Sequence, residues 1–303
     1  MNQPQQPEQQ PEQQPEQPHA NPAIRLHYGY ASDRGLRREL NEDSLVASDP
    51  VFAIADGMGG HEAGEVASSV CVSTLGNHPL LSSKPARVSA ADLQEVLSEA
   101  DSAIRRITDS RAGTTVSGVV MVEEMGNPYW LVFNVGDSRT YRLSEGALEQ
   151  ISVDHSQVQE MVDSGQITPA EAFIHPLRNV VTQALGTGPA AEADFWMLPI
   201  DEGDRMLLCS DGLSGEVDEG QIVEILTAFD SPQDATDALI QAALRTGGRD
   251  NISVIVIDAS NEREKKLATD PGTDTEEVEV TTIPKPVVAA AGESEAPAAE
   301  EGQ

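Results

Sequence analysis

Short apolar segments separated by Gly and Asp recur through the middle of the chain. Their shortness and β-branched content predict buried strands, at 51–55, 115–122, 129–135, 138–143, 205–209 and 252–257. Longer stretches between them have the apolar spacing of helices, at 62–75, 90–108, 155–164, 218–229 and 233–246. Asp218 and Ser231 are expected to cap the last two helices, with Pro232 at the first helical position.

The order of these elements favours antiparallel sheets covered by helices. The strands at 115–122, 129–135 and 138–143 follow one another without a helix between them, whereas a parallel sheet needs a long crossover between neighbouring strands. Residues 1–23 are a Pro, Gln and Glu repeat, and residues 260–303 are rich in Glu, Thr, Ala and Pro, so both are expected to be disordered. The predicted folded domain is therefore 24–259.

The charge balance narrows the choice of partner. The 303 residues include 51 acidic and 19 basic ones, for a net charge of −32. The N-terminal 23 residues and residues 261–303 carry −3 and −7 of this, which leaves −22 on the predicted domain. Such an excess repels nucleic acid and anionic membranes, and it suits the capture of cations. The alternative is that acidity only keeps the protein soluble.

Two cysteines are too few for a disulfide framework. Cys71 and Cys209 both lie among apolar residues, which predicts buried free thiols in a reducing compartment. The N-terminus has neither the basic start nor the apolar run of a signal peptide, and no stretch is long and apolar enough to span a membrane. We expect a cytoplasmic protein.

Aspartates stand at the ends of the predicted strands. Asp56, Asp137 and Asp211 each follow a strand, Asp250 precedes one, and Asp43 lies in a further acidic segment. Each Asp-Gly pair alone is typical of a turn. If the strand ends converge, however, carboxylates of like charge would be buried together, and a hard divalent cation that takes oxygen ligands would compensate them.

Eight blocks in fixed order make a family resemblance visible. They are GLRRELNEDS (35–44), VFAIADGMGGHEAGEVAS (51–68), AGTTVSGVVM (112–121), NVGDSRTYRL (134–143), VDHSQVQEMVDSGQIT (153–168), HPLRNVVTQALG (175–186), LLCSDGLSGEV (207–217) and GGRDNISVIVI (247–257). Together they resemble the PPM (type 2C) metal-dependent serine/threonine protein phosphatases in their compact bacterial form. The resemblance implies an α+β fold, with a central sandwich of two antiparallel sheets flanked by helices on both sides.

The resemblance also implies a metal centre of two core Mn²⁺ or Mg²⁺ ions and a third, weaker one. Asp56 would bridge the two core ions, and Asp211 and Asp250 would complete the shell of the first. The carbonyl of Gly57 would ligate the second ion, and Asp43 would act on that ion through water. Asp137, together with Asp211, would hold the third.

The implied reaction is hydrolysis of phosphoserine and phosphothreonine in proteins by water held between the metals. Arg38 would grip the substrate phosphate with its fork of donors, and residues 154–180 would form a flap that influences substrate choice. The expected partners are phosphorylated proteins, the products of serine/threonine kinases in signal transduction.

Two positions depart from the family pattern. Met58 stands where many eukaryotic members carry a histidine that protonates the leaving alcohol. His61 could take over that role, since a histidine titrates near neutral pH, or it could only order the glycine loop. Ser253 stands where Thr is usual.

Other readings of the same sequence fare less well. Ser138 could suggest a serine esterase, but neither histidine that follows it stands in an Asp-x-x-His pattern; Cys-x5-Arg, which a cysteine phosphatase needs, is absent from the sequence. The remaining alternative is a catalytically inactive PPM fold that serves as a binding or regulatory module. A further hypothesis is that the threonines of 269–282 are phosphorylated and bound by a phosphothreonine-binding domain; an unmodified solubilising tail is the alternative.

Overall fold

The computed structural model describes residues 24–59 and 63–261. The two terminal segments that we expect to be disordered lie outside these residues, as does the threonine cluster of 269–282. In the described part of the chain, no helix is both long and apolar enough to cross a membrane.

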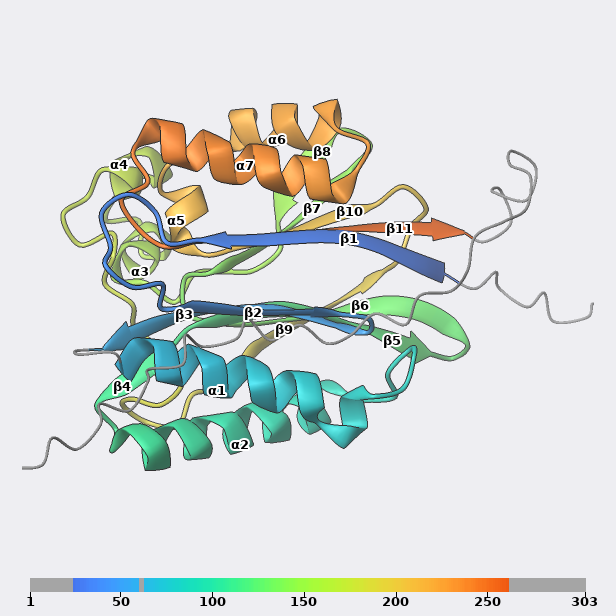
Figure 1. Ribbon diagram of the computed structural model, residues 1–303, viewed down its shortest axis with the longest axis horizontal. Coiled ribbons are helices and arrows are strands. Elements are labelled where there is room, and N and C mark those ends of the chain that lie inside the picture. Colours follow the sequence, from blue (N-terminus) through green and yellow to red (C-terminus); the bar gives the residue numbers. More distant parts are fainter. Residues whose placement is uncertain (1–23, 60–62, 262–303) are drawn as a thin grey trace, which may run out of the picture. The chain divides into compact units, whose positions relative to one another are not determined.

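Two antiparallel sheets form the centre of the fold (Figure 1). The first runs in the order β1 (Ile24–Asp33), β11 (Ile252–Asn261), β10 (Arg205–Cys209), β7 (Arg139–Ser144) and β8 (Ala147–Gln150). The second runs in the order β2 (Asp43–Ser48), β3 (Val51–Gly59), β5 (Val116–Glu124), β6 (Asn127–Val135) and β9 (Asp194–Pro199), and β4 (Ala112–Thr114) also pairs with β3.

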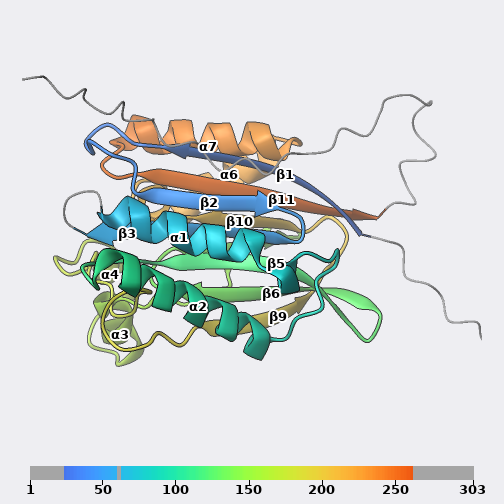
Figure 2. The ribbon, with the colours of Figure 1, turned by 60° about the horizontal axis from the view of Figure 1, so that its bottom comes forward.

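Helices cover the outer face of each sheet. α1 (Ala63–Asn77) and α2 (Ala90–Thr108) lie side by side on the second sheet, and a single 3₁₀ turn (η1, Pro79–Leu81) follows α1 (Figure 2). The short α5 (Asp211–Ser214), α6 (Glu219–Ala228) and α7 (Pro232–Thr246) lie on the first sheet. Two more short helices, α3 (Gln157–Asp163) and α4 (Pro169–Phe173), belong to the segment between β8 and β9.

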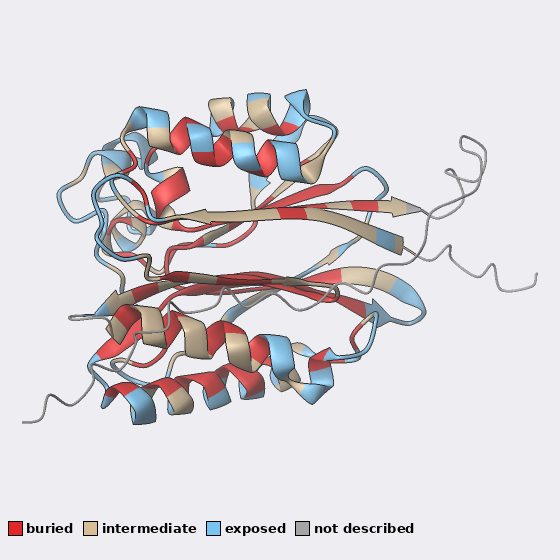
Figure 3. Cartoon of the chain, viewed as in Figure 1, coloured by how far each residue is buried: buried red, intermediate tan, exposed pale blue. Residues whose placement is uncertain are grey.

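Three apolar cores match these four layers. One lies between the two sheets and includes Phe52, Trp130 and Ile255, and each sheet has another core beneath its helices. Figure 3 shows the consequence, since the inner faces of the helices are buried and the outer faces exposed. Burying a large apolar side chain contributes about 1.5–3 kcal/mol, so the inter-sheet core stabilises the sandwich strongly.

The predicted architecture of two antiparallel sheets flanked by helices is confirmed. Asp218 and Ser231 cap α6 and α7 as predicted, with Pro232 at the first helical position. The helix expected at 155–164 is shorter, because the side chain of Ser156 caps it and the first helical residue is Gln157. The predicted strand 51–55 is too short, since pairing with β4 extends β3 to Gly59 and takes Asp56 into the strand.

Candidate active site

Five aspartates from both sheets meet at one end of the sandwich. Asp43 begins β2 and lies opposite Asp56 of β3 in the strand register. Asp137 follows β6, Asp211 opens α5 just after β10, and Asp250 immediately precedes the loop into β11. Asp43 and Asp137 are buried, whereas the other three are partly exposed. The convergence expected from the strand ends is therefore present.

The carboxyl groups of this aspartate cluster interact with one another and with serines. Asp56 repels the other four aspartates electrostatically, and they repel it in turn. Ser210 donates from Oγ to Oδ2 of Asp43 over 2.8 Å, and the backbone N–H of Ser253 donates to Ser210 Oγ over 3.0 Å. The side chain of Ser253, the residue at this departure from the family pattern, shares a hydrogen bond of 2.8 Å with the hydroxyl of Ser32.

The cluster strongly disfavours negative charge. Burial, and then repulsion from neighbouring aspartates, raises the pKa of Asp43 to about 7, that of Asp137 to about 8 and that of Asp211 to about 6. The pKa of Asp56 is also raised well above its ordinary value, for the same two reasons in the same order. At neutral pH such a group of carboxyls is compensated either by protons or by bound cations.

Two carboxylate oxygens at this site are enclosed and have no hydrogen-bond partner among the residues that the structure describes. They are Oδ1 of Asp43 and Oδ1 of Asp211, although the Asp211 residue as a whole is partly exposed. Enclosed acceptors without donors are costly, and a hard cation satisfies them with the oxygen ligands that it prefers. As placed, no three His, Cys, Asp or Glu side chains within residues 24–59 and 63–261 could hold an ion. The chemistry of the donor set nevertheless fits a divalent metal, because its oxygens are the ligands that such an ion prefers.

Gly57 brings bare backbone next to the cluster. A Cβ atom at this position would collide with the carbonyl oxygen of Gly64 and lie 2.6 Å from that of Glu42, so no side chain can be accommodated. The backbone N–H of Gly57 donates to the Glu42 carbonyl, so the backbone of this strand end is held beside the segment that carries Asp43.

Arg38 is held by carboxylates at the edge of the cluster. Its Nη2 donates to Oδ2 of Asp250 over 2.7 Å, and its Nη1 lies 3.8 Å from the Glu42 carboxylate. The side chain is 47% exposed, so its guanidinium also faces solvent. His61, the candidate proton donor, lies outside the described residues.

Sequence reasoning missed Glu42 and Asn251. Asn251 accepts from the backbone N–H of Glu42 and donates to the carbonyls of Arg34 and Leu40, so it fastens the Arg38 loop beside Asp250. Glu42 itself approaches Arg38, and its pKa is raised, chiefly by burial. Their positions in the sequence could have pointed to them, because Glu42 directly precedes Asp43 and Asn251 directly follows Asp250.

The flap segment, defined here as residues 154–180, is fastened at its base to the turn that carries Asp137. Ser156 and Val181 pair across the base. On one side of Asp137, His155 exchanges two hydrogen bonds with Gly136, through its backbone N–H and its Nδ1. On the other side, Arg139 forms an ion pair with Asp154 at 2.7 Å, reinforced by further hydrogen bonds between the two side chains.

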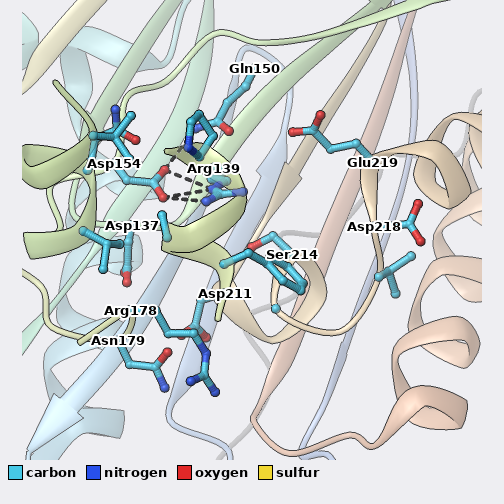
Figure 4. Close-up of a pocket in the computed structure, with 18 of the residues that line it drawn as sticks. Asp137, Arg139, Gln150, Asp154, Arg178, Asn179, Asp211, Ser214, Asp218 and Glu219 are labelled. Atoms are coloured by element: carbon cyan, nitrogen blue, oxygen red, sulfur yellow. Dashed lines mark hydrogen bonds and ion pairs between the residues drawn. The ribbon is translucent and has the colours of Figure 1, made fainter. Parts of the chain in front are cut away.

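A pocket of about 560 Å³ opens between the aspartate cluster and the flap (Figure 4). Asp137 and Asp211 line one side of it, and α3 and α4 contribute apolar side chains. The Arg139–Asp154 ion pair lies on its inner wall. Asp137 and Asp211, two of the candidate metal ligands, are therefore accessible from a cavity large enough for a side chain of a protein substrate.

The rejected nucleophiles are inaccessible. Ser138 is fully buried and its hydroxyl bonds to that of Thr115 over 2.8 Å. Cys71 and Cys209 are buried free thiols, as predicted, and burial raises the pKa of each to about 12, which keeps them protonated.

Two antiparallel sheets between two helical layers, with aspartates gathered at one end, define the phosphatase 2C type of fold. The family model for protein phosphatase 2C matches residues 37–251. The chain belongs to the protein phosphatase 2C family, as its sequence blocks predict.

Relatives and solved structures agree with this assignment. The serine/threonine protein phosphatase PstP of Mycobacterium tuberculosis is 42% identical over 246 residues, which cover 79% of this chain and 46% of PstP, so the chain spans about half the length of that relative. The serine/threonine phosphatase stp of Listeria monocytogenes is 34% identical over 243 residues, which cover 77% of this chain and 96% of stp. The PstP catalytic domain in complex with two manganese ions superimposes with a TM-score of 0.71 at 38% identity, covering 78% of this chain and all (100%) of that one.

Proposed function

We propose that this protein is a metal-dependent phosphatase that hydrolyses phosphoserine and phosphothreonine in proteins. The observation that carries the proposal is the pair of enclosed, unpartnered carboxylate oxygens of Asp43 and Asp211 within a cluster of five aspartates at a pocket. The family assignment and the two manganese ions bound by the PstP catalytic domain support the same conclusion.

In this proposal the aspartates bind the ions as the family pattern implies. Asp56, Asp211 and Asp250 would hold a first Mn²⁺ or Mg²⁺ ion, and Asp56 and the Gly57 carbonyl would hold a second. Asp43, which accepts a hydrogen bond from Ser210, would act on the second ion through water. Asp137 and Asp211 would hold a third, more weakly bound ion.

Bound divalent ions supply positive charge that acidifies water and neutralises the phosphoryl oxygens during in-line attack. The other steps fall to the chain itself. Arg38 positions the phosphate through its planar fork of N–H donors. Because Arg38 is bonded to Asp250, a cation held at Asp250 would compete for that carboxylate and would leave the guanidinium available to substrate. His61 is proposed to donate the proton to the leaving alcohol.

The biological setting follows from the substrate class. Phosphoserine and phosphothreonine proteins are the products of serine/threonine kinases, so we propose a role in signal transduction that opposes such kinases in the cytoplasm. The acidic surface of the chain, with a net charge of −32, favours protein partners over nucleic acid.

The test is hydrolysis of para-nitrophenyl phosphate and of phosphopeptides by the purified protein with Mn²⁺, with Mg²⁺ and after chelation. We expect activity only with metal, and a preference for phosphoserine and phosphothreonine over phosphotyrosine. Asp56→Asn and Asp211→Asn proteins that keep the wild-type circular dichroism spectrum should lose the activity. A protein that binds Mn²⁺ in calorimetry but hydrolyses neither substrate class would instead be an inactive binding module.

A further inference from the structure

The pocket beside the aspartate cluster extends well past the residues that the proposed chemistry uses. From Asp137 and Asp211 it continues beneath the flap to the start of α6, where Asp218 and Glu219 line it. Its flap side includes the apolar side chains of Val158, Val162 and Phe173. A phosphorylated side chain that reaches the aspartate cluster therefore leaves this outer part of the pocket open to a neighbouring residue of the substrate.

The two ends of the pocket differ in charge. Arg178, Asn179 and Asp211 all line the pocket, and Figure 4 shows them on the same side of the view, at the end where bound cations and a phosphate would meet. Asp218 and Glu219 stand on the opposite wall. Between these ends, the charge of Asp154 is compensated by its ion pair with Arg139. With metal on the cluster, the outer end keeps its negative charge, which Asp218 and Glu219 supply.

Glu219 is the available carboxylate at the outer end. It is exposed and has no ion pair or hydrogen-bond partner among residues 24–59 and 63–261, whereas Oδ1 of Asp218 caps α6 by accepting from Gln221 over 3.0 Å. Its carboxylate is directed toward the pocket in Figure 4. Tyr141 also lines the pocket.

We propose that this outer part of the pocket binds a Lys or Arg side chain of the phosphoprotein, close in sequence to the phosphorylated residue. Glu219 provides the opposite charge for the basic group, and Val158, Val162 and Phe173 contact its methylene stem, since long basic side chains bury their stems on apolar surface. The inference rests on the proposed phosphatase function and adds a substrate class to it, namely phosphorylated sites with a nearby basic residue.

The experiment measures kcat/KM of the Mn²⁺-loaded protein on a series of phosphothreonine peptides. Lys, Ala or Glu is placed in turn at each of the positions flanking the phosphothreonine, and phosphate release is followed. At one position or two neighbouring ones, we expect Lys to exceed Ala by about 3- to 10-fold and Glu to fall below Ala, because a partly exposed charge pair contributes modestly to binding. High salt should reduce the difference.

Variants of one helix identify the group responsible. Glu219→Gln should abolish most of the preference for Lys, and Glu219→Lys should reverse it in favour of Glu. Glu224→Gln is the matched control, because Glu224 is also exposed and on α6 but does not line the pocket. It should keep the wild-type preference.

The outcomes separate this inference from the function on which it rests. Equal kcat/KM for Lys, Ala and Glu peptides, or a Lys preference that survives Glu219→Gln or is lost equally in Glu224→Gln, would overturn the basic-residue subsite while leaving the phosphatase intact. Failure of the wild-type protein to hydrolyse even para-nitrophenyl phosphate with Mn²⁺ would overturn the function and the subsite together.

Discussion

Removal of metal makes the stability of this protein depend on pH in an unusual direction. Most folded proteins lose stability when their carboxylates are protonated, but Asp43, Asp137 and Asp211 have folded pKa values of about 7, 8 and 6, above the ordinary value of 3.8. The folded, metal-free protein therefore holds protons that the unfolded chain has already released. Between the unfolded and the folded pKa of each of these groups, the free energy of unfolding therefore falls as pH rises.

The size of the effect follows from the shifts. Each pH unit between the unfolded and folded pKa of one group costs about 1.4 kcal/mol of stability. Between pH 5.5 and pH 8, ionisation of Asp43 lowers the free energy of unfolding by about 2 kcal/mol, because the folded pKa of Asp43 lies about one and a half units above pH 5.5. Ionisation of Asp137 lowers it by a similar or larger amount. The aspartates repel one another, so the losses of the individual groups overlap and do not add in full. We therefore expect the free energy of unfolding to fall by about 2–5 kcal/mol in total, or roughly 5–15 °C in Tm for a domain of this size.

The assay is thermal denaturation at pH 5.5 and pH 8, with EDTA and with excess Mn²⁺. The Tm with EDTA should be lower at pH 8, and Mn²⁺ should shrink or reverse the difference because a cation stabilises the ionised carboxylates. Asp43→Asn removes one of the titrating groups, so it should flatten the pH dependence of the metal-free protein. A metal-free protein that is equally or more stable at pH 8, or an Asp43→Asn variant with the full decrease, would refute the reasoning.

Three further outcomes are expected. Arg38→Ala should raise KM about 5- to 30-fold with a smaller change in kcat, since a charge-assisted contact at a half-exposed site is partly screened. Arg38→Lys should restore only part of the lost binding. Arg37→Ala, the control, should leave KM unchanged. Asp137→Ala should lose the weakest of the metal sites in calorimetry and turn over slowly, and loss of the tight sites would place Asp137 among the core ligands instead. A protein restricted to residues 24–261 should match the full chain on para-nitrophenyl phosphate, and a large deficit would assign the terminal segments a part in catalysis.

Strands with a continuous apolar run could be predicted from the sequence, and strands at the sheet edges could not. The apolar runs of β5, β6, β10 and β11 are visible because both faces of these strands are covered. β1 was missed because it is an edge strand with only Gly29 fully buried. A side chain there would collide with the backbone of Gln233 in α7, and this contact depends on a helix more than 200 residues away in the chain.

The candidate site was predictable in its residues but not in its present pairing. Asp43, Asp56, Asp137, Asp211 and Asp250 could be named because strand ends and family blocks mark them, and their convergence follows from the fold. The ion pair of Arg38 with Asp250, and the hydrogen bond from Ser210 to Asp43, depend on the local charge balance and not on any pattern in the sequence. The fastening role of Asn251 could not be predicted for a similar reason, since its three partners lie more than 200 residues away.

The base of the flap makes this segment an exchangeable module. Gln157 and Thr182 are joined to the opposite strand of the base by backbone hydrogen bonds, to Val180 and His155 respectively, which any sequence can form. The side chains that hold the base to the Asp137 turn, those of Asp154 and His155, lie outside the interval between these bonds. A chimaera that takes residues 158–179 from another family member should therefore fold and keep its catalytic end, so that substrate scope can be altered independently of the chemistry.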